Sequence, residues 1–139
     1  MRYWLFKSEP DTWSWDQQQA AGEKGTQWDG VRNYQARNNM RAMELGDQGF
    51  FYHSNVGKEV VGIVEVCALA HPDTTADDPK WECVDIRAVK PVKTPVTLEM
   101  AKTDPRLADM VLVNNSRLSV QPVTEAEWRV ICELGGVEP

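Results

Sequence analysis

The run VVGIVEVCALA, Val60–Ala70, decides the fold class of this sequence. It is almost continuously apolar and dominated by β-branched residues, which is typical of a buried strand. Before it, a turn at Ser54–Gly57 follows the aromatic run GFFYH, Gly49–His53. After it, the polar and acidic loop Asp73–Asp78 leads into Trp81–Val92, where apolar and charged residues alternate as in a half-buried strand. The middle of the chain is therefore predicted to be mainly β-structure.

One strand and two helices are predicted for the N-terminal third of the chain. Tyr3–Lys7 is short, aromatic and apolar, as buried strands are. A serine followed three residues later by a glutamine forms a capping box for a helix over Trp15–Ala20. Gly22–Gly30 is predicted to be a loop. Apolar residues at helical spacing predict a helix over Asn33–Met43.

Short elements are predicted for the C-terminal third. Pro91 and Pro95 are expected to end the third strand of the central region. A short helix over Thr97–Lys102 and a short strand over Arg117–Val120 follow. A second capping box, with Thr124 as its N-cap, begins a final helix that a Gly-Gly pair stops. No βαβ period is visible, so the sequence predicts an α+β fold with a mixed sheet or a small barrel.

The length and the net charge of the chain narrow the classes of function it can have. The 139 residues, 42% of them apolar, fit a single domain over residues 1–139. A net charge of −6 excludes attraction of the whole surface to phosphate as a source of affinity. Three arginines and no acid lie between Gly30 and Met43, whereas six acids and one lysine lie between Glu65 and Asp85. Any contact with nucleic acid is therefore expected to be local.

The remaining composition indicates a cytoplasmic protein. The apolar start is too short for a signal peptide or a membrane span. Cys67, Cys83 and Cys132 are far apart, which indicates reduced and mostly buried thiols and argues against a metal site. Six tryptophans are many for this length, and we assign four of them to the core or to partly buried positions.

Four polar clusters follow predicted strands or precede a predicted helix. They are Lys7–Glu9, Trp28–Asn33, Tyr52–Asn55 and Asn114–Ser119. Small barrels build their sites at such ends, so we expect the four clusters to line one cavity.

The second cluster is the most informative. A glycine before a helix lets the backbone approach a ligand, and the free N–H groups of the first helical turn accept an anion. Gly30 would supply that approach, Trp28 a stacking face, and Arg32 and Asn33 donors, so a small anion is expected in the pocket. The alternative, that Asp29 caps the helix and the tryptophan belongs to the core, stays open.

The sequence offers little to an enzyme mechanism. It lacks the G-x-S-x-G elbow, the zinc-deaminase signature, the Walker A motif and the G-x-G-x-x-G motif. His53 and Ser54 are adjacent, and adjacent residues of a strand point to opposite faces. His53 can equally be a partly buried hydrogen-bonding histidine. Arg117 can be a bidentate donor in the pocket or an ion pair at the surface.

Taken together, Trp4–Pro10, Trp28–Asn38, Gly49–Ser54 and Ser116–Val120 closely resemble the EVE domain family. The likeness runs in order along nearly the whole chain. It implies a PUA-like fold, a mixed and mostly antiparallel β pseudo-barrel flanked by short helices. It also implies capture of one modified nucleobase, a modified cytosine or a related base of DNA or RNA, without a cofactor.

The resemblance also implies site residues. Trp28 and Tyr52 would be ring contacts, and three further residues would face the edge of the base. The polar wall would complete the pocket. The implied ligand-binding set is Ser8, Trp28, Gly30, Val31, Arg32, Asn33, Tyr52, His53, Ser54, Arg117 and Ser119.

Three functions remain in competition. The first is a binding module that is not an enzyme. The second is a hydrolase of modified nucleosides, as in the PUA-like ASCH domains, with Lys7, Glu9 and His53 in acid–base roles. The third is an adaptor for other proteins, which would require a large exposed apolar patch.

Overall fold

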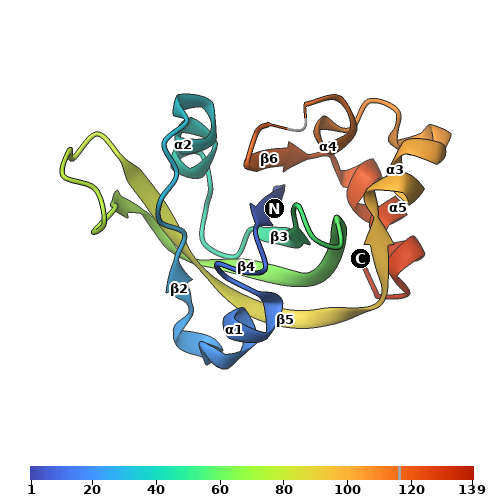
Figure 1. Cartoon of the computed structure of the whole chain (residues 1–139), viewed down its shortest axis with the longest axis horizontal. Coiled ribbons are helices and arrows are strands. Elements are labelled where there is room, and N and C mark those ends of the chain that lie inside the picture. The colour runs from blue at the N-terminus through green and yellow to red at the C-terminus, as the bar shows by residue number, and fades with distance from the viewer. Residues whose placement is uncertain (116) are drawn as a thin grey trace.

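A mixed six-stranded sheet organises the chain, with the strand order β2-β5-β4-β3-β1-β6 (Figure 1). The computed structural model describes residues 1–115 and 117–139; Ser116, part of the fourth polar cluster, lies outside the described residues. β1 and β3 pair in parallel, and every other pairing is antiparallel. The strands are β1 Tyr3–Ser8, β2 Thr26–Gln27, β3 Gln48–His53, β4 Glu59–Pro72, β5 Glu82–Thr97 and β6 Val120–Val123.

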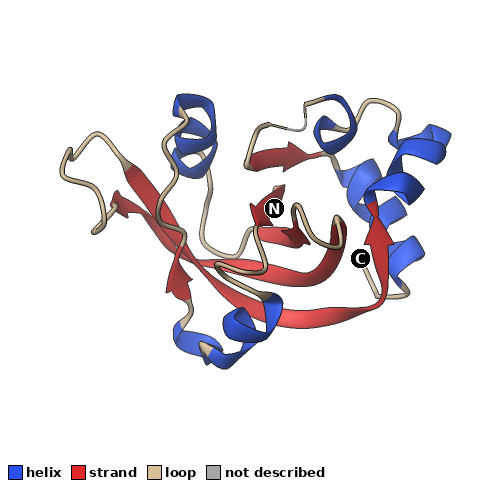
Figure 2. Cartoon of the chain, viewed as in Figure 1, coloured by secondary structure: helices blue, strands red, loops and turns tan. Residues whose placement is uncertain are grey.

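Short helices surround the sheet (Figure 2). The capping boxes at Ser14 and Thr124 are both formed, each with its reciprocal pair of hydrogen bonds. Gly136 ends the last helix in the left-handed conformation, as the Gly-Gly pair predicted. The helices are α1 Trp15–Ala20, α2 Tyr34–Arg41, α3 Leu98–Thr103, α4 Val111–Asn114 and α5 Glu125–Gly135, with 3₁₀ turns η1 Gly22–Lys24 and η2 Pro105–Leu107.

The three central strands are confirmed, but β5 does not end at the prolines. It continues through Pro91 and Pro95 to Thr97. The register against β4 shifts between Val60 and Gly62: these residues are two positions apart on β4, but their partners Val96 and Pro91 are five positions apart on β5. At such a bulge some backbone groups do not pair with the neighbouring strand. Proline is tolerated there because it has no backbone N–H that would need a partner.

Two cores lie on opposite faces of the sheet. Phe6 and Phe51 belong to the pocket-side core, which α1 and α2 cover, whereas Leu5, Phe50 and Tyr52 belong to the helix-side core, which α5 covers. Neighbours along a strand therefore enter different cores, as pleating requires. Four of the six tryptophans are buried and the other two, Trp13 and Trp81, are partly buried, so more of them contribute to packing than the four expected.

α1 is docked onto the sheet by a tryptophan that rests on bare backbone. The ring of Trp15 covers Gly62 of β4, where a Cβ atom would lie 2.2 Å from Cζ2 of the ring. The backbone N–H of Trp15 donates to Nε2 of His53 at 3.0 Å. A glycine is therefore required at position 62, near the start of β4, for a steric reason.

The arginine-rich segment and the acidic loop meet in space. Asn33, which was predicted to be the first helical residue, is instead the N-cap of α2, and its side chain accepts from the N–H of Ala36. Arg32 pairs with Asp73 at 3.1 Å, and Arg41 pairs with Glu82. Two stretches of opposite charge that are forty residues apart thus neutralise one another.

Two further predicted boundaries are wrong. The predicted loop Gly22–Gly30 contains η1 and β2, because the backbone of Thr26–Gln27 pairs with β5. The C-terminal strand was predicted over Arg117–Val120, but β6 begins at Val120, and Arg117 lies in a turn before it. Within residues 1–115 and 117–139, no helix combines the length and apolarity needed to cross a membrane.

Candidate functional site

An open pocket of about 570 Å³ lies where the end of β1, the loop before α1, β2 and the segment before α2 converge. This volume is within the range of sites for small molecules. The lining residues are Lys7, Ser8, Glu9, Thr12, Trp13, Thr26, Gln27, Trp28, Asp29, Gly30, Val31, Arg32 and Ser119.

Trp28 borders the pocket from within the core. Its backbone N–H donates to the carbonyl of Val84 at 2.8 Å, which fixes the chain beside β5. Its ring meets Phe6 and Phe51 edge-on, with centroids 5.5 Å and 5.7 Å away. The side chain is 8% exposed, so both open interpretations hold in part: Trp28 is a core residue and it lines the pocket.

A second tryptophan, Trp13, also lines the pocket. Its indole N–H donates to Oε1 of Gln18 at 2.9 Å, and the buried Gln18 amide donates to the carbonyl of Ile86. The hydroxyl of Ser8 donates to the carbonyl of Trp13. These bonds fix the ring before a ligand arrives, and this preorganisation favours binding.

Asp73 of the acidic loop binds Gly30 and Arg32, which form one rim of the pocket. Its carboxylate accepts from the N–H of Gly30 at 2.9 Å, from the guanidinium of Arg32 at 3.1 Å, and from the N–H and hydroxyl of Thr75. Burial alone would raise the pKa of Asp73, but the hydrogen bonds from Thr75, Gly30 and Arg32 outweigh it and lower the pKa to about 2. Gly30 has φ +79°, a conformation that favours glycine, so the rim depends on that residue.

Two titratable side chains of the pocket are shifted toward their neutral forms. Burial raises the pKa of Asp29, and the nearby charge of Asp73 raises it further, against the opposing effects of Arg32 and Gln27. Burial lowers the pKa of Lys7. The pocket therefore offers a carboxyl acceptor and an ammonium donor, each sensitive to pH.

Six residues of the predicted set line the pocket, and the expectation that all four clusters would do so is wrong. The six come from the first, second and fourth clusters: Ser8, Trp28, Gly30, Val31, Arg32 and Ser119. Ser119 is placed there because its carbonyl accepts from the N–H of Lys7 at 2.9 Å. Whether these residues bind a ligand remains a prediction.

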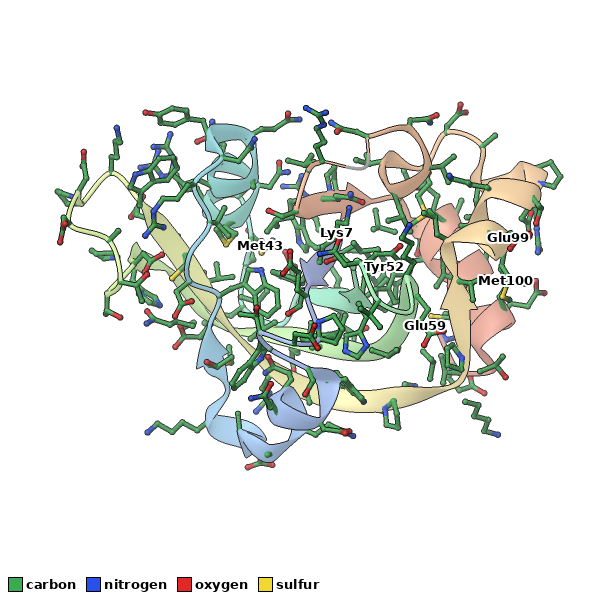
Figure 3. The ribbon with its side chains drawn as sticks, in the orientation of Figure 1. Lys7, Met43, Tyr52, Glu59, Glu99 and Met100 are labelled. Atoms are coloured by element: carbon green, nitrogen blue, oxygen red, sulfur yellow. The ribbon has the colours of Figure 1, made fainter. Side chains whose placement is uncertain are left out.

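Tyr52 does not line the pocket. It is 2% exposed and belongs to the helix-side core, because the pleat of β3 sends it to the face opposite Phe51. Lys7 lines the pocket and also approaches Tyr52, with Nζ 5.8 Å from the ring centroid; the two residues are labelled in Figure 3. Burial and the charge of Glu59 raise the pKa of Tyr52 to about 12, so it remains neutral.

The other residues of the third cluster have structural roles. His53 accepts from the N–H of Trp15, so it is the partly buried hydrogen-bonding histidine of the alternative interpretation. Burial is the main cause that lowers the pKa of His53. The N–H of Ser54 donates to the carbonyl of Ser8 at 2.8 Å, which extends the pairing of β1 with β3.

Two more predicted residues, Asn33 and Arg117, also lie outside the pocket lining. The side chain of Asn33 caps α2. Arg117 is exposed in the turn before β6, where its N–H contacts Oδ1 of Asn115. Arg117 therefore lies at the surface and does not line the pocket.

The basis for the expected anion is weaker than the sequence suggested. The free helical N–H groups were to lie at Gly30, but α2 begins at Tyr34 and Asn33, not Asp29, caps it. The N–H of Gly30 and the guanidinium of Arg32 are already bonded to Asp73. The acceptors Glu9 and Asp29 line the same pocket.

Sequence reasoning missed one wall of the pocket. Trp13, Thr26 and Gln27 all line it, although Trp13 precedes a capping box and the other two lie in a predicted loop. A signal for Trp13 was available, because the residue before an N-cap often packs against the helix and fixes the path of the chain. Strand β2 has two residues and no pattern that could reveal it.

Comparisons with known proteins agree with this architecture. The EVE domain family model matches residues 2–134. A crystal structure of a protein from Agrobacterium tumefaciens superposes with a TM-score of 0.97 at 63% identity, covering 99% of this chain and 94% of that one. Thymocyte nuclear protein 1 of Mus musculus is 38% identical over 99% of this chain and 75% of its own length.

One solved relative contains nucleic acid. The human THYN1 protein, in complex with 5-methylcytosine containing DNA, has a TM-score of 0.90 at 35% identity, with both chains fully covered. The YTH domain of Zygosaccharomyces rouxii MRB1 has a TM-score of 0.60 at 17% identity over 99% of this chain and 88% of that one. This last likeness concerns the fold and confirms the predicted PUA-like class. The family match over most of the chain, together with relatives well above 30% identity, shows that this chain belongs to the EVE domain family.

Proposed function

We propose that this protein binds one modified nucleobase, 5-methylcytosine or a closely related base of DNA or RNA, in the pocket that Trp13 and Trp28 line. One observation carries the proposal: the chain shares its fold and 35% of its residues with the human THYN1 protein, which was crystallised with 5-methylcytosine containing DNA. In this chain, the pocket has aromatic and polar walls and a volume suited to a small ligand.

The chemistry of the pocket fits a cytosine. A base extruded from its stack is read along its Watson–Crick edge while aromatic or apolar side chains hold its faces. Cytosine presents an N4 amino donor, and a carboxylate is the usual acceptor for that group. Asp29 supplies that carboxylate, and Val31 and the tryptophans supply apolar surface for a 5-methyl group.

Calorimetric titration with 5-methyl-2′-deoxycytidine and 2′-deoxycytidine tests the proposal. One buried methyl group should favour the modified nucleoside by about three- to tenfold. Asp29→Asn should weaken both nucleosides, whereas Asp109→Asn, an exposed aspartate away from the pocket lining, should leave them unchanged. Equal affinity for both nucleosides, or none for either, would contradict the proposal.

The raised pKa of Asp29 adds a test by pH. The charged carboxylate accepts from N4, so affinity should be full at neutral pH and fall as the pH drops through this raised pKa. The fall should begin above the pH at which an ordinary aspartate protonates, near 3.8. Asp29→Asn should remove this part of the pH dependence.

A second candidate function, hydrolysis of a modified nucleoside, is favoured by one observation. Lys7 and Glu9 line the same pocket, and burial lowers the pKa of Lys7 toward the range useful for acid–base catalysis. We propose that the protein binds without turnover. Chromatography of modified nucleosides after incubation decides this, because conversion that Lys7→Ala or Glu9→Ala abolishes would establish the enzyme.

We also propose that the protein works in a reducing compartment such as the cytoplasm. Its three cysteines are free, and burial raises the pKa of Cys83 to about 12 and that of Cys132 to about 11. Thiols that remain protonated react slowly. Localisation of the tagged protein tests this proposal.

A further inference from the structure

A pair of stacked aromatic rings lies on the surface beside the pocket, where α2 meets the loop between β4 and β5. The rings of Tyr34 and Trp81 have centroids 5.0 Å apart and planes 26° apart. Tyr34 is 53% exposed, although it is a large ring in the first turn of a helix. α2 and the β4–β5 loop lie at the same end of the molecule (Figure 1).

Three cations surround the two rings. The guanidinium of Arg37 lies 4.9 Å from the centroid of Tyr34 and 5.9 Å from that of Trp81. Nζ of Lys80 lies 5.5 Å and 5.6 Å from the same centroids, and the guanidinium of Arg32 lies 5.7 Å from Trp81. We name this group, Arg32, Tyr34, Arg37, Lys80 and Trp81, the basic aromatic patch.

The cations of the patch differ in their partners. Arg32 is paired with the buried carboxylate of Asp73, and Lys80 lies 3.7 Å from Asp78. Arg37 donates instead to neutral acceptors, Oδ1 of Asn38 and the carbonyl of Lys80, and no carboxylate among residues 1–115 and 117–139 lies within ion-pair distance of it. Its positive charge is therefore the one in the patch that is compensated least.

The patch adjoins the pocket through Arg32, which lines the pocket and also packs against Trp81. Proteins that hold single strands combine cations, which follow the phosphates, with aromatic rings, on which bases stack. A base held in the pocket stays attached to its strand. A strand that leaves the pocket past Arg32 meets Arg37 and Tyr34 next, because Arg32 and Arg37 both lie over Trp81 and Arg37 lies over Tyr34.

We propose that the basic aromatic patch binds the strand next to the captured nucleotide, with Arg37 contacting a phosphate and Tyr34 contacting the flanking base. This inference rests on the proposed function, because it takes the base in the pocket as its starting point. The protein thus reads a modified base through the pocket and gains affinity for its strand through the patch. The net charge of −6 and the acids of the same loop, Asp77 and Asp78, confine that affinity to a few phosphates.

The test compares a short single-stranded oligonucleotide carrying one central 5-methylcytosine with the free nucleoside 5-methyl-2′-deoxycytidine. Arg37→Gln should weaken the oligonucleotide by about three- to tenfold and make the salt slope shallower by about 0.7, the value for one phosphate on a single strand. Tyr34→Ala should weaken it by about fivefold or more, whereas Tyr34→Phe retains a stacking ring and most of the affinity. Affinity for the nucleoside should not change in any of these variants.

The control is Arg129→Gln, because Arg129 on α5 is equally cationic, its side chain is 66% exposed, and it lies away from the patch. Thermal unfolding checks that the variants are folded. Unchanged oligonucleotide affinity in Arg37→Gln and Tyr34→Ala, or an equal loss for the nucleoside, would overturn the inference. The proposed function fails separately: if the wild type binds the oligonucleotide through Arg37 but not the nucleoside, the patch is supported and the base pocket is not.

Discussion

The two faces of the sheet both carry cores with buried aromatic rings, but they hold their tryptophans differently. In the helix-side core, Trp128 stacks on both Tyr3 and Phe50, with centroids 4.4 Å and 4.0 Å away. In the pocket-side core, Trp28 meets Phe6 and Phe51 at interplanar angles of 73° and 80°. A ring stacked on its neighbours is committed to packing, whereas edge-on contact can leave a ring face to border a pocket. Burial alone therefore does not separate a structural tryptophan from a binding one.

The largest effect should come from Trp128→Ala. This substitution empties the centre of the helix-side core and should lower the free energy of unfolding by about 3–5 kcal/mol. Nucleoside affinity of the folded fraction should not change, because the side chain does not line the pocket. Urea unfolding and calorimetry below the melting temperature measure the two quantities. A loss of affinity in the folded variant would break the division between the faces.

Trp13→Ala should show the opposite pattern. Its ring is half-buried and lines the pocket, so we expect a loss of about 1–3 kcal/mol in nucleoside binding. Stability should fall by less than in Trp128→Ala. Trp13→Phe, which retains an aromatic face, is the matched control and should keep part of the affinity. Undiminished binding by Trp13→Ala would remove this tryptophan from the site.

Acid should destabilise the rim of the pocket. The pKa of Asp73 is lowered to about 2, so its stabilising effect is complete above the ordinary value of 3.8 and is lost as the pH falls from there to about 2. We expect about 1–2 kcal/mol of stability to disappear over that window. Urea unfolding between pH 5 and pH 2 should show a smaller change in Asp73→Asn, with Asp109→Asn as the control. Parallel pH curves for wild type and Asp73→Asn would contradict this account of the rim.

The smallest effect should come from Tyr52→Phe. The resemblance to the family implied that Tyr52 contacts the base, but the structure buries its ring on the opposite face. Nucleoside affinity should stay within a factor of about two of the wild type, since no atom of the pocket lining is removed. A large loss in calorimetric titration would show that the Tyr52 hydroxyl reaches the ligand and that the structural division is wrong.

Local patterns predicted the fold well because its elements begin and end with local chemistry. The capping boxes at Ser14 and Thr124 and the alternation around Ile86 depend on residues a few positions apart. The site depends on contacts over long distances in the chain, such as Gly30 with Asp73, which no local pattern contains. The strand parity of Phe51 and Tyr52 was readable, but which face carries the pocket was not. The alternation of side chains along a strand shows which residues share a face of the sheet. Which of the two faces carries a pocket depends on how the helices pack on each face.

The contact between Trp15 and Gly62 influences the position of the loop before α1, although Gly62 itself does not line the pocket. Trp13 and Thr12 line the pocket and lie within three residues of Trp15, whose ring can rest on β4 only because position 62 has no side chain. One added methyl group in Gly62→Ala would displace that ring and shift the loop while the strand ladder around it persists. A substitution at Gly62, which does not line the pocket, can thus alter the shape of the pocket in a protein that still folds.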